Sequence, residues 1–370
     1  MTSARTDAYR SLDIWRGFAA LWVTAFHSFG PWIETQPELL PVPLAGFLKS
    51  GWLGVHIFFV ISGYCITARL ASDYRGRKPA SNFLVDRLWR IFPPYWAALI
   101  FSAGLAILGT VFNSTPILGT GDHPGAIPST ITGGFASLLA LEPWLNQPSY
   151  LLVAWTISYE IAFYLIAALV YGILGNQIGP KAAFIAAGLL AIWPAVAPSH
   201  LVPGPLGLWP HFAMGAGVWL LIERLRGKNP VLITVFCVVA LVLISAASMM
   251  KITTAAALTA AATACALVAL HRYDSALAKS RPLAWLSSLG VISYSLYLVH
   301  VPIVGKFRNL LGRSFPEANW TSWWVPSMGV LLSVLGAYIF YRLVEAPSER
   351  ARKSFRSSPP PVAQVAGLKT

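Results

Sequence analysis

The chain has 370 residues, of which 56% are hydrophobic and 11% are charged, whereas roughly a quarter of the residues in an ordinary soluble domain are charged. So few charged side chains cannot cover the surface of a chain this long, which excludes a disordered chain, a coiled coil and a conventional soluble enzyme. The net charge of +13 would indicate a nucleic-acid partner in a soluble protein. Lys and Arg in cytoplasmic loops explain it better, so we expect contact with membrane lipid and no nucleic acid.

Runs of about twenty apolar residues follow one another along the chain, as in polytopic membrane proteins. The predicted membrane spans are 11–33, 51–70, 91–112, 150–174, 182–198, 206–223, 230–248, 252–270, 284–304 and 325–345. The stretch between the third and fourth spans is too long for a simple turn, and its residues 131–145 are expected to form a short interfacial or re-entrant helix. The predicted fold is therefore all-α, a membrane bundle of about ten transmembrane helices.

Basic residues indicate how the chain is oriented. With the N-terminus in the cytoplasm, most of the 27 Lys and Arg residues fall on the inner side, as the positive-inside rule requires. An even number of helices then places both termini in the cytoplasm. We expect residues 1–350 to form one membrane domain and residues 351–370, which are rich in Ser, Pro and basic residues, to form a disordered cytoplasmic tail.

The first span contains polar side chains that a lipid-facing helix would avoid. Asp13, Arg16 and His27 lie on one stripe, because eleven residues make about three helical turns and three residues make nearly one. An Arg or Asp near the bilayer centre costs about 3 kcal/mol, so the stripe is expected to face the protein interior. A neutral imidazole can remove a proton from a hydroxyl near pH 7, which makes His27 the candidate base. The alternative is a structural His27 that is hydrogen-bonded between helices.

Two further histidines lie in apolar spans. His56, in the second span, is a titratable group in the outer half of the predicted bundle. His300, near the end of the ninth span, is expected close to the outer interface, where hydration makes it less costly, and it is a weaker candidate than His27. The sequence has no clustered metal ligands, no HExxH, no Walker loop and no GxSxG, so we expect neither a metal site nor ATP hydrolysis.

Arg87 and Arg90 stand at the start of the third span. They are three residues apart on one helix face at the inner membrane boundary, and such a pair can hold phosphates by forked hydrogen bonds. The alternative is that both side chains extend toward lipid headgroups.

The fourth span contains a carboxylate, Glu160, with Tyr164 one turn later and Trp155 near the start of the span. A buried Glu must be paired, hydrogen-bonded or neutral. Its expected partner is Arg16 or His27, and the sequence does not choose between them.

Together these segments resemble one family, the integral-membrane acyltransferase 3 group, which includes O-acetyltransferases of bacterial lipopolysaccharide and exopolysaccharide. The matching pieces follow one another in the chain at 11–27, 51–63, 87–95, 155–164 and 292–302. The family motif of a basic residue, ten intervening positions and a histidine falls on Arg16 and His27, and its Arg-x-x-Arg motif falls on Arg87 and Arg90. His56 departs from the pattern, because the family often has an acidic residue there.

The resemblance implies an O-acyltransferase that moves an acyl group, usually acetyl from acetyl-CoA, to a hydroxyl group. The acceptor would be a glycan, a lipid-linked sugar or a small metabolite, and the enzyme would lie in a bacterial inner (plasma) membrane. In the mechanism that we expect, His27 takes the proton from the acceptor hydroxyl or transiently carries the acyl group. Asp13 and Arg16 orient the site or bind the donor.

The remaining candidates complete this mechanism. Arg87 and Arg90 hold the anionic CoA, and Glu160 sets the charge state of a neighbouring His or Arg. The rival class is a proton-coupled secondary transporter, because intramembrane Arg, Glu and His also suit proton transport. The acyltransferase motifs and the missing internal repeats count against it.

Overall fold

The structure, a computed structural model, describes residues 9–113, 127–174, 190, 204–222, 254–314 and 322–357. This part of the chain consists of helices, turns and loops and contains no β-strand, which confirms the all-α class. The α-helices are α1 (Leu12–Thr35), α2 (Val42–Lys49), α3 (Gly54–Arg75), α4 (Ala80–Asn113), α5 (Ile131–Leu139), α6 (Ala154–Leu169), α9 (Trp209–Leu220), α11 (Thr254–Leu270), α12 (Asp274–Ala278), α13 (Ala284–Val291), α14 (Ser293–Ser314), α15 (Trp324–Phe340) and α16 (Ala346–Ser357).

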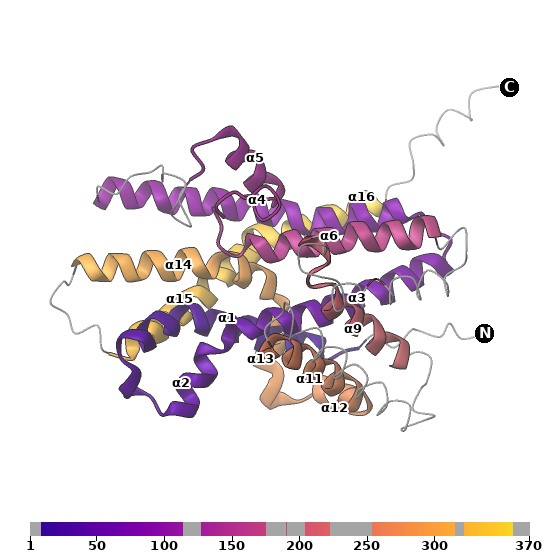
Figure 1. Cartoon of the computed structure of the whole chain (residues 1–370), viewed down its shortest axis with the longest axis horizontal. Helices are drawn as coiled ribbons and strands as arrows, with labels where there is room; N and C mark the ends of the chain where they lie inside the picture. Colours follow the sequence, from indigo (N-terminus) through magenta and orange to yellow (C-terminus); the bar gives the residue numbers. More distant parts are fainter. Residues whose placement is uncertain are drawn as a thin grey trace.

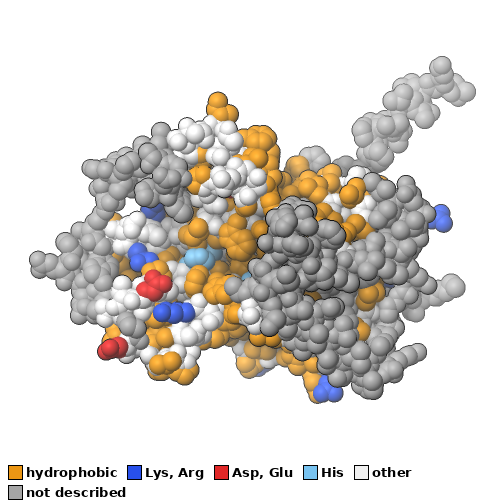
Figure 2. Space-filling view, in the orientation of Figure 1, with side chains coloured by type: hydrophobic (Ala, Val, Ile, Leu, Met, Phe, Trp, Pro, Cys, Tyr) orange, Lys and Arg blue, Asp and Glu red, His pale blue; other side chains and the backbone are white. Residues whose placement is uncertain are grey.

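The long helices lie along a shared direction and form a bundle (Figure 1). On the face drawn in Figure 2, hydrophobic side chains form a band across the middle, and the charged side chains of the described residues lie toward the two ends of the long axis. A histidine side chain is visible within the band. An apolar band between two polar ends is the surface expected of a bundle that spans a bilayer.

Several helical stretches are long and apolar enough to cross a membrane. There are five of them among the described residues, Val42–Arg75, Ala80–Leu108, Ala154–Gly172, Thr254–Ala278 and Trp324–Ser354, with α13 and α14 as a bent sixth. They coincide with six of the predicted spans. Helix α1 covers the first predicted span but is not one of the six, and the polar residues on its stripe lower its hydropathy. The predicted span 230–248 and all of 182–198 except residue 190 lie outside the described residues, so the count of ten and the placement of both termini stay predictions.

The ninth predicted span is not one continuous helix. It breaks at Ile292, where α13 meets α14 at an angle of 71°. Just before the break, α13 approaches α1 so closely that a Cβ atom on Gly290 would lie 1.8 Å from the carbonyl oxygen of Asp13. A Cβ atom on Gly17 of α1 would likewise lie 1.9 Å from the carbonyl oxygen of Leu286. The break lets α13 pack on α1 while α14 begins inside the bundle.

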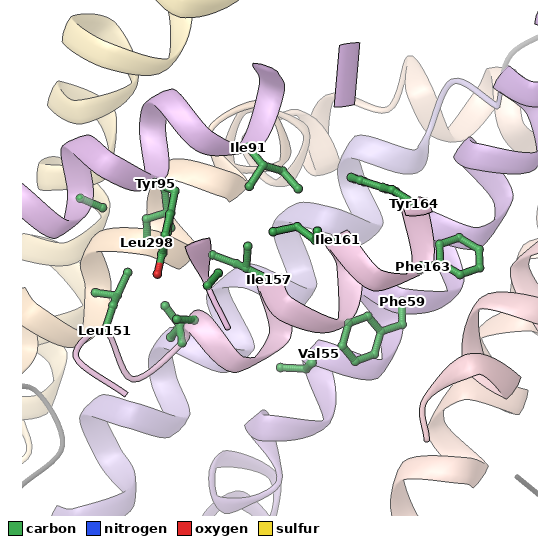
Figure 3. Close-up of a cluster of buried hydrophobic side chains, with 14 of the residues drawn as sticks. Val55, Phe59, Ile91, Tyr95, Leu151, Ile157, Ile161, Phe163, Tyr164 and Leu298 are labelled. Carbon is green, nitrogen blue, oxygen red and sulfur yellow. The ribbon is translucent and has the colours of Figure 1, made fainter. Parts of the chain in front are cut away.

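The core lies between α3, α4, α6 and α14. Figure 3 shows Phe59, Tyr95, Ile157 and Leu298 in this cluster, each contributed by a different one of these helices. Within a bilayer such close packing, rather than the hydrophobic effect, holds helices together. The short helix α5 confirms a helix within 131–145, although it ends at Leu139.

A cluster of ion pairs joins α3, α4 and α16. Asp86 of α4 lies 3.0 Å from Arg69 and 3.0 Å from Arg352, and Arg69 also pairs with Asp73 at 2.5 Å. Asp86 is buried, so these contacts compensate a charge that would otherwise be costly. They also explain why α16 continues to Ser357, past the expected start of the tail, while the division into domain and tail stays a prediction.

Candidate active site

A cavity of about 130 Å³ lies between α1, α3, α4, α6 and α14. Its lining includes Arg16, Arg87, Arg90, Glu160 and Tyr164; these five residues are called the arginine cavity below. The structure thus brings together predicted site residues from three separate helices. Figure 3 shows Tyr164 on α6 beside apolar lining residues from α3 and α4.

Glu160 is held by hydroxyl groups. Ser62 Oγ donates a hydrogen bond to Glu160 Oε1 at 3.1 Å, and the Tyr164 hydroxyl donates a short hydrogen bond to the same oxygen. Neither Arg16 nor His27 forms an ion pair with Glu160 within the described part of the chain. The hydrogen-bond partners of Glu160 therefore differ from the two that the sequence predicts. They are Ser62 on the neighbouring helix α3 and Tyr164 on α6 itself.

Three arginines and one carboxylate, Glu160, stand among the described lining residues of the cavity. The guanidinium group of Arg87 lies 5.8 Å from the ring centre of Phe83 and 5.7 Å from that of Tyr164. No ion pair of Arg87 or Arg90 exists with any described residue. Two guanidinium groups that form no ion pair with a described residue, in an apolar enclosure, favour the entry of an anion.

A second carboxylate lies behind the cavity lining. Glu345 is buried, and its Oε2 accepts hydrogen bonds from Ser295 Oγ at 2.5 Å and from the Ser295 backbone amide at 3.2 Å. It also interacts electrostatically with Arg16 and Arg90. Sequence reasoning did not single out Glu345 as a site residue, although a carboxylate in the last apolar span carries the same signal that identified Glu160.

His27 and His300 lie outside this lining and contact each other; they are called the histidine pair below. His300 Nε2 is 3.2 Å from His27 Nδ1, and the ring centres are 4.9 Å apart. The connection to the cavity is Tyr297, which lines the cavity and whose ring centre is 5.9 Å from that of His300. The Tyr297 hydroxyl is 2.7 Å from Oγ1 of Thr156, a residue of α6 that also lines the cavity. The two parts of the site are thus neighbours, joined by the ring contact between Tyr297 and His300.

Three other predicted residues belong to neither part. His56 is buried and faces α9, where its ring centre lies 4.8 Å from that of His211. Trp155 is partly exposed and packs against Tyr159. Asp13 contacts the site through Arg16, because their charged groups are 3.5 Å apart, and 42% of the Asp13 side chain is solvent-accessible.

Glu142, in the loop after α5, is a buried residue that the sequence reasoning missed. Its side chain is fully buried. Burial raises the pKa of Glu142, and neither of its carboxylate oxygens has a hydrogen-bond partner among the described residues. No spacing motif marks such a residue, because its burial depends on how the loop folds back onto α4 and α6.

Comparison with known proteins identifies relatives over nearly the whole chain. A family model described as an acyltransferase domain matches residues 9–342. The O-acetyltransferase OatA of Staphylococcus aureus (strain MRSA252) is 26% identical over 96% of this chain and 60% of its own length. The acyltransferase MdmB of Streptomyces mycarofaciens is 25% identical over 96% of both chains. Nodulation protein 10 of Rhizobium leguminosarum bv. viciae is 28% identical over half of each.

The chain therefore spans about 60% of the length of the S. aureus relative. No solved structure matches it. The family match contains both the arginine cavity and His27 and His300, so the residues of the site lie within the family domain. On this match, the chain belongs to the acyltransferase family of integral-membrane proteins.

Proposed function

We propose that the chain is a membrane O-acyltransferase that moves an acyl group, acetyl in the simplest case, from acyl-CoA to a hydroxyl group. The observation that carries this proposal is the position of the arginine cavity next to the histidine pair, which provides an anion site beside a proton acceptor. The names of the relatives, an O-acetyltransferase and an acyltransferase, support the same reaction class. Family membership also disfavours a proton-coupled transporter.

The proposed donor site is the arginine cavity. Arg87 and Arg90 supply forked donors that match phosphate oxygens. A cavity of about 130 Å³ is close to the size that holds a benzene-sized molecule, so it cannot enclose a whole CoA. We place the phosphates at Arg87 and Arg90 and the thioester arm inside, pointing past Tyr297 toward the histidine pair. Glu160 then acts by fixing Tyr164, whose ring lies beside Arg87.

The proposed chemistry is transfer assisted by His27. The acceptor oxygen attacks the thioester carbonyl while its proton passes to His27. The carbon–sulfur bond breaks, and the CoA thiolate then takes the proton from His27, so an ester and a free thiol are the products. A transient acyl group on His27 is the alternative form of the same reaction. We propose a carbohydrate hydroxyl as acceptor and a bacterial inner membrane as location, following the family resemblance.

The orientation has a direct test. If both termini are cytoplasmic, single cysteines at Leu44 and Leu310 should react with an impermeant thiol reagent added outside intact cells. A cysteine at Lys353 should react only after the membrane is opened. Labelling of Lys353→Cys from outside would place Arg87 and Arg90 on the wrong side for cytosolic CoA.

The activity test uses membranes that contain the chain, supplied with radiolabelled acetyl-CoA. We expect label in a glycan or small-metabolite fraction, and His27→Ala should lose it while the protein still accumulates in the membrane. His271→Ala is the matched control, because His271 lies outside both parts of the site. Near-normal labelling by His27→Ala would remove His27 from the chemistry, and no labelling by the wild type would contradict the proposed reaction with this donor.

A further inference from the structure

The contacts of His300 determine which of its ring nitrogens carries the proton. His300 is fully buried, and its Nδ1 lies 2.9 Å from the carbonyl oxygen of Leu296. A carbonyl oxygen only accepts hydrogen bonds, so Nδ1 must be the protonated nitrogen. In the neutral ring the other nitrogen, Nε2, then has a lone pair and can only accept.

The same reasoning extends to His27. His27 Nδ1 lies 3.2 Å from His300 Nε2 and 3.0 Å from the carbonyl oxygen of Val23. Both neighbours are acceptors, so His27 Nδ1 must carry a proton. The opposite tautomer would direct the Nδ1 lone pair of His27 at two other lone pairs, which is repulsive. With both rings neutral, one arrangement satisfies all of these contacts, and it leaves Nε2 of His27 as the basic nitrogen.

We infer that His300 is a positioning residue that, together with the carbonyl oxygen of Val23, fixes the tautomer and the ring orientation of His27, so that His27 Nε2 is the atom that takes the proton of the acceptor hydroxyl. This inference rests on the proposed function. When Nε2 takes the proton, His27 becomes an imidazolium whose Nδ1–H still donates to His300. A base oriented by a third group is the arrangement that many nucleophilic sites use.

Packing supports the fixed orientation of both rings. Phe26 lies edge-on to the His27 ring, with ring centres 5.0 Å apart, and Tyr297 packs against His300. His300 is on α14, which begins at the break after α13, so the position of this partner depends on the bend at Ile292. The two histidines are 273 residues apart in the sequence, so only the folded chain creates the pair.

The tautomer can be measured without any activity. Wild-type protein with ¹⁵N-labelled histidine in lipid nanodiscs gives nitrogen NMR shifts that distinguish a protonated Nδ1 from a protonated Nε2, and the His27 signals are those that disappear in His27→Gln. We expect a protonated Nδ1 on His27 in the wild type. In His300→Phe the Val23 carbonyl alone still accepts from this nitrogen, so its signal should shift and the other tautomer should gain population. A protonated Nε2 on neutral wild-type His27, or an unchanged His27 spectrum in His300→Phe, would overturn the inference.

Kinetics with acetyl-CoA then separates positioning from packing. His300→Phe keeps the ring volume but removes the acceptor, and we expect kcat to fall about 10- to 150-fold, the size of a hydrogen bond to a charged group, with an unchanged KM for acetyl-CoA. His300→Gln can present an amide oxygen near the position of Nε2, and it should restore kcat to within about threefold. Equal loss in both variants, or an increase in KM alone, would overturn the positioning role. An inactive wild type would instead count against the proposed function, while the NMR result would still decide the tautomer.

Discussion

The arginine cavity and the histidine pair differ in the charge of their side chains. The cavity gathers three guanidinium groups around one carboxylate, and its residues come from several helices. The histidine pair comes from α1 and α14 alone, and its hydrogen bonds are satisfied with both rings uncharged. A charged enclosure suits the binding of an anionic donor, whereas a neutral base suits proton transfer. The proposed function therefore assigns donor binding and chemistry to neighbouring but separate regions, so substitutions should affect KM in one and kcat in the other.

The largest effect is expected from removing the proposed base, His27, and it tests whether the two regions act separately. His27→Ala should lower kcat about 100- to 10,000-fold, the usual contribution of general base catalysis, with a KM for acetyl-CoA close to that of the wild type. Initial rates over a range of acetyl-CoA concentrations measure both constants. A large increase in KM would show that His27 also holds the donor, and the separation of the two regions would be wrong.

The converse test concerns the cavity. Arg87→Ala or Arg90→Ala should weaken apparent acyl-CoA affinity about 10- to 150-fold, because each change removes a charge-assisted hydrogen bond of roughly 1.5–3 kcal/mol. Lys at either position should restore affinity only partly, since it supplies charge without the fork. Arg272→Ala is the matched control, because Arg272 is exposed and packs on Tyr273.

Donor and acceptor dependence must be measured separately in these variants. If acceptor dependence shifted while donor dependence stayed the same, Arg87 and Arg90 would belong to the acceptor site or to folding.

The contact between the two regions can be tested at its hydroxyl group. Tyr297→Phe removes the hydrogen bond to Thr156 and keeps the ring against His300. A neutral hydrogen bond contributes about 0.5–1.5 kcal/mol, so kcat should fall about two- to tenfold with little change in KM. Tyr338→Phe, on the exposed face of α15, is the control. An increase in KM without a change in kcat would assign Tyr297 to donor binding.

The smallest expected effect concerns stability away from both regions. Because burial raises the pKa of Glu142, the folded state binds its proton more tightly than the unfolded state, so stability falls as pH rises above the unfolded value of about 4. Glu142→Gln should raise the midpoint of thermal denaturation at pH 7.5 by about 2 °C or more and raise it less at pH 4.5. Glu38→Gln, at an exposed position, should change neither midpoint. An equal rise at both pH values would show that ionisation of Glu142 is not the cause.

The sequence predicts where the helices lie in the chain better than it predicts which side chains of different helices contact each other. Long apolar runs located α3, α4, α6, α11 and α15, because the bilayer fixes the length of a span. The cost of charges in lipid led to the prediction that Arg16 and Glu160 are site residues, and the structure places both at one cavity. What could not be predicted is which faces meet: Glu160 bonds to Ser62 rather than to Arg16, and His56 packs on His211. These contacts depend on the rotation and order of helices in the bundle, which no single-span pattern contains.

The crossing of α1 and α13 has a consequence for how mutations accumulate in this protein. At Gly17 and Gly290 even a methyl group would collide with the backbone of the facing helix. Alanine at either position would push α13 away from α1 and carry α14, with His300, away from His27. Inactivating changes are therefore expected at two positions that offer no functional group, and a mutational scan would mark them as sensitive as the histidines. In the proposed mechanism, the absence of a side chain at these two glycines is what sets the position of His300 relative to His27.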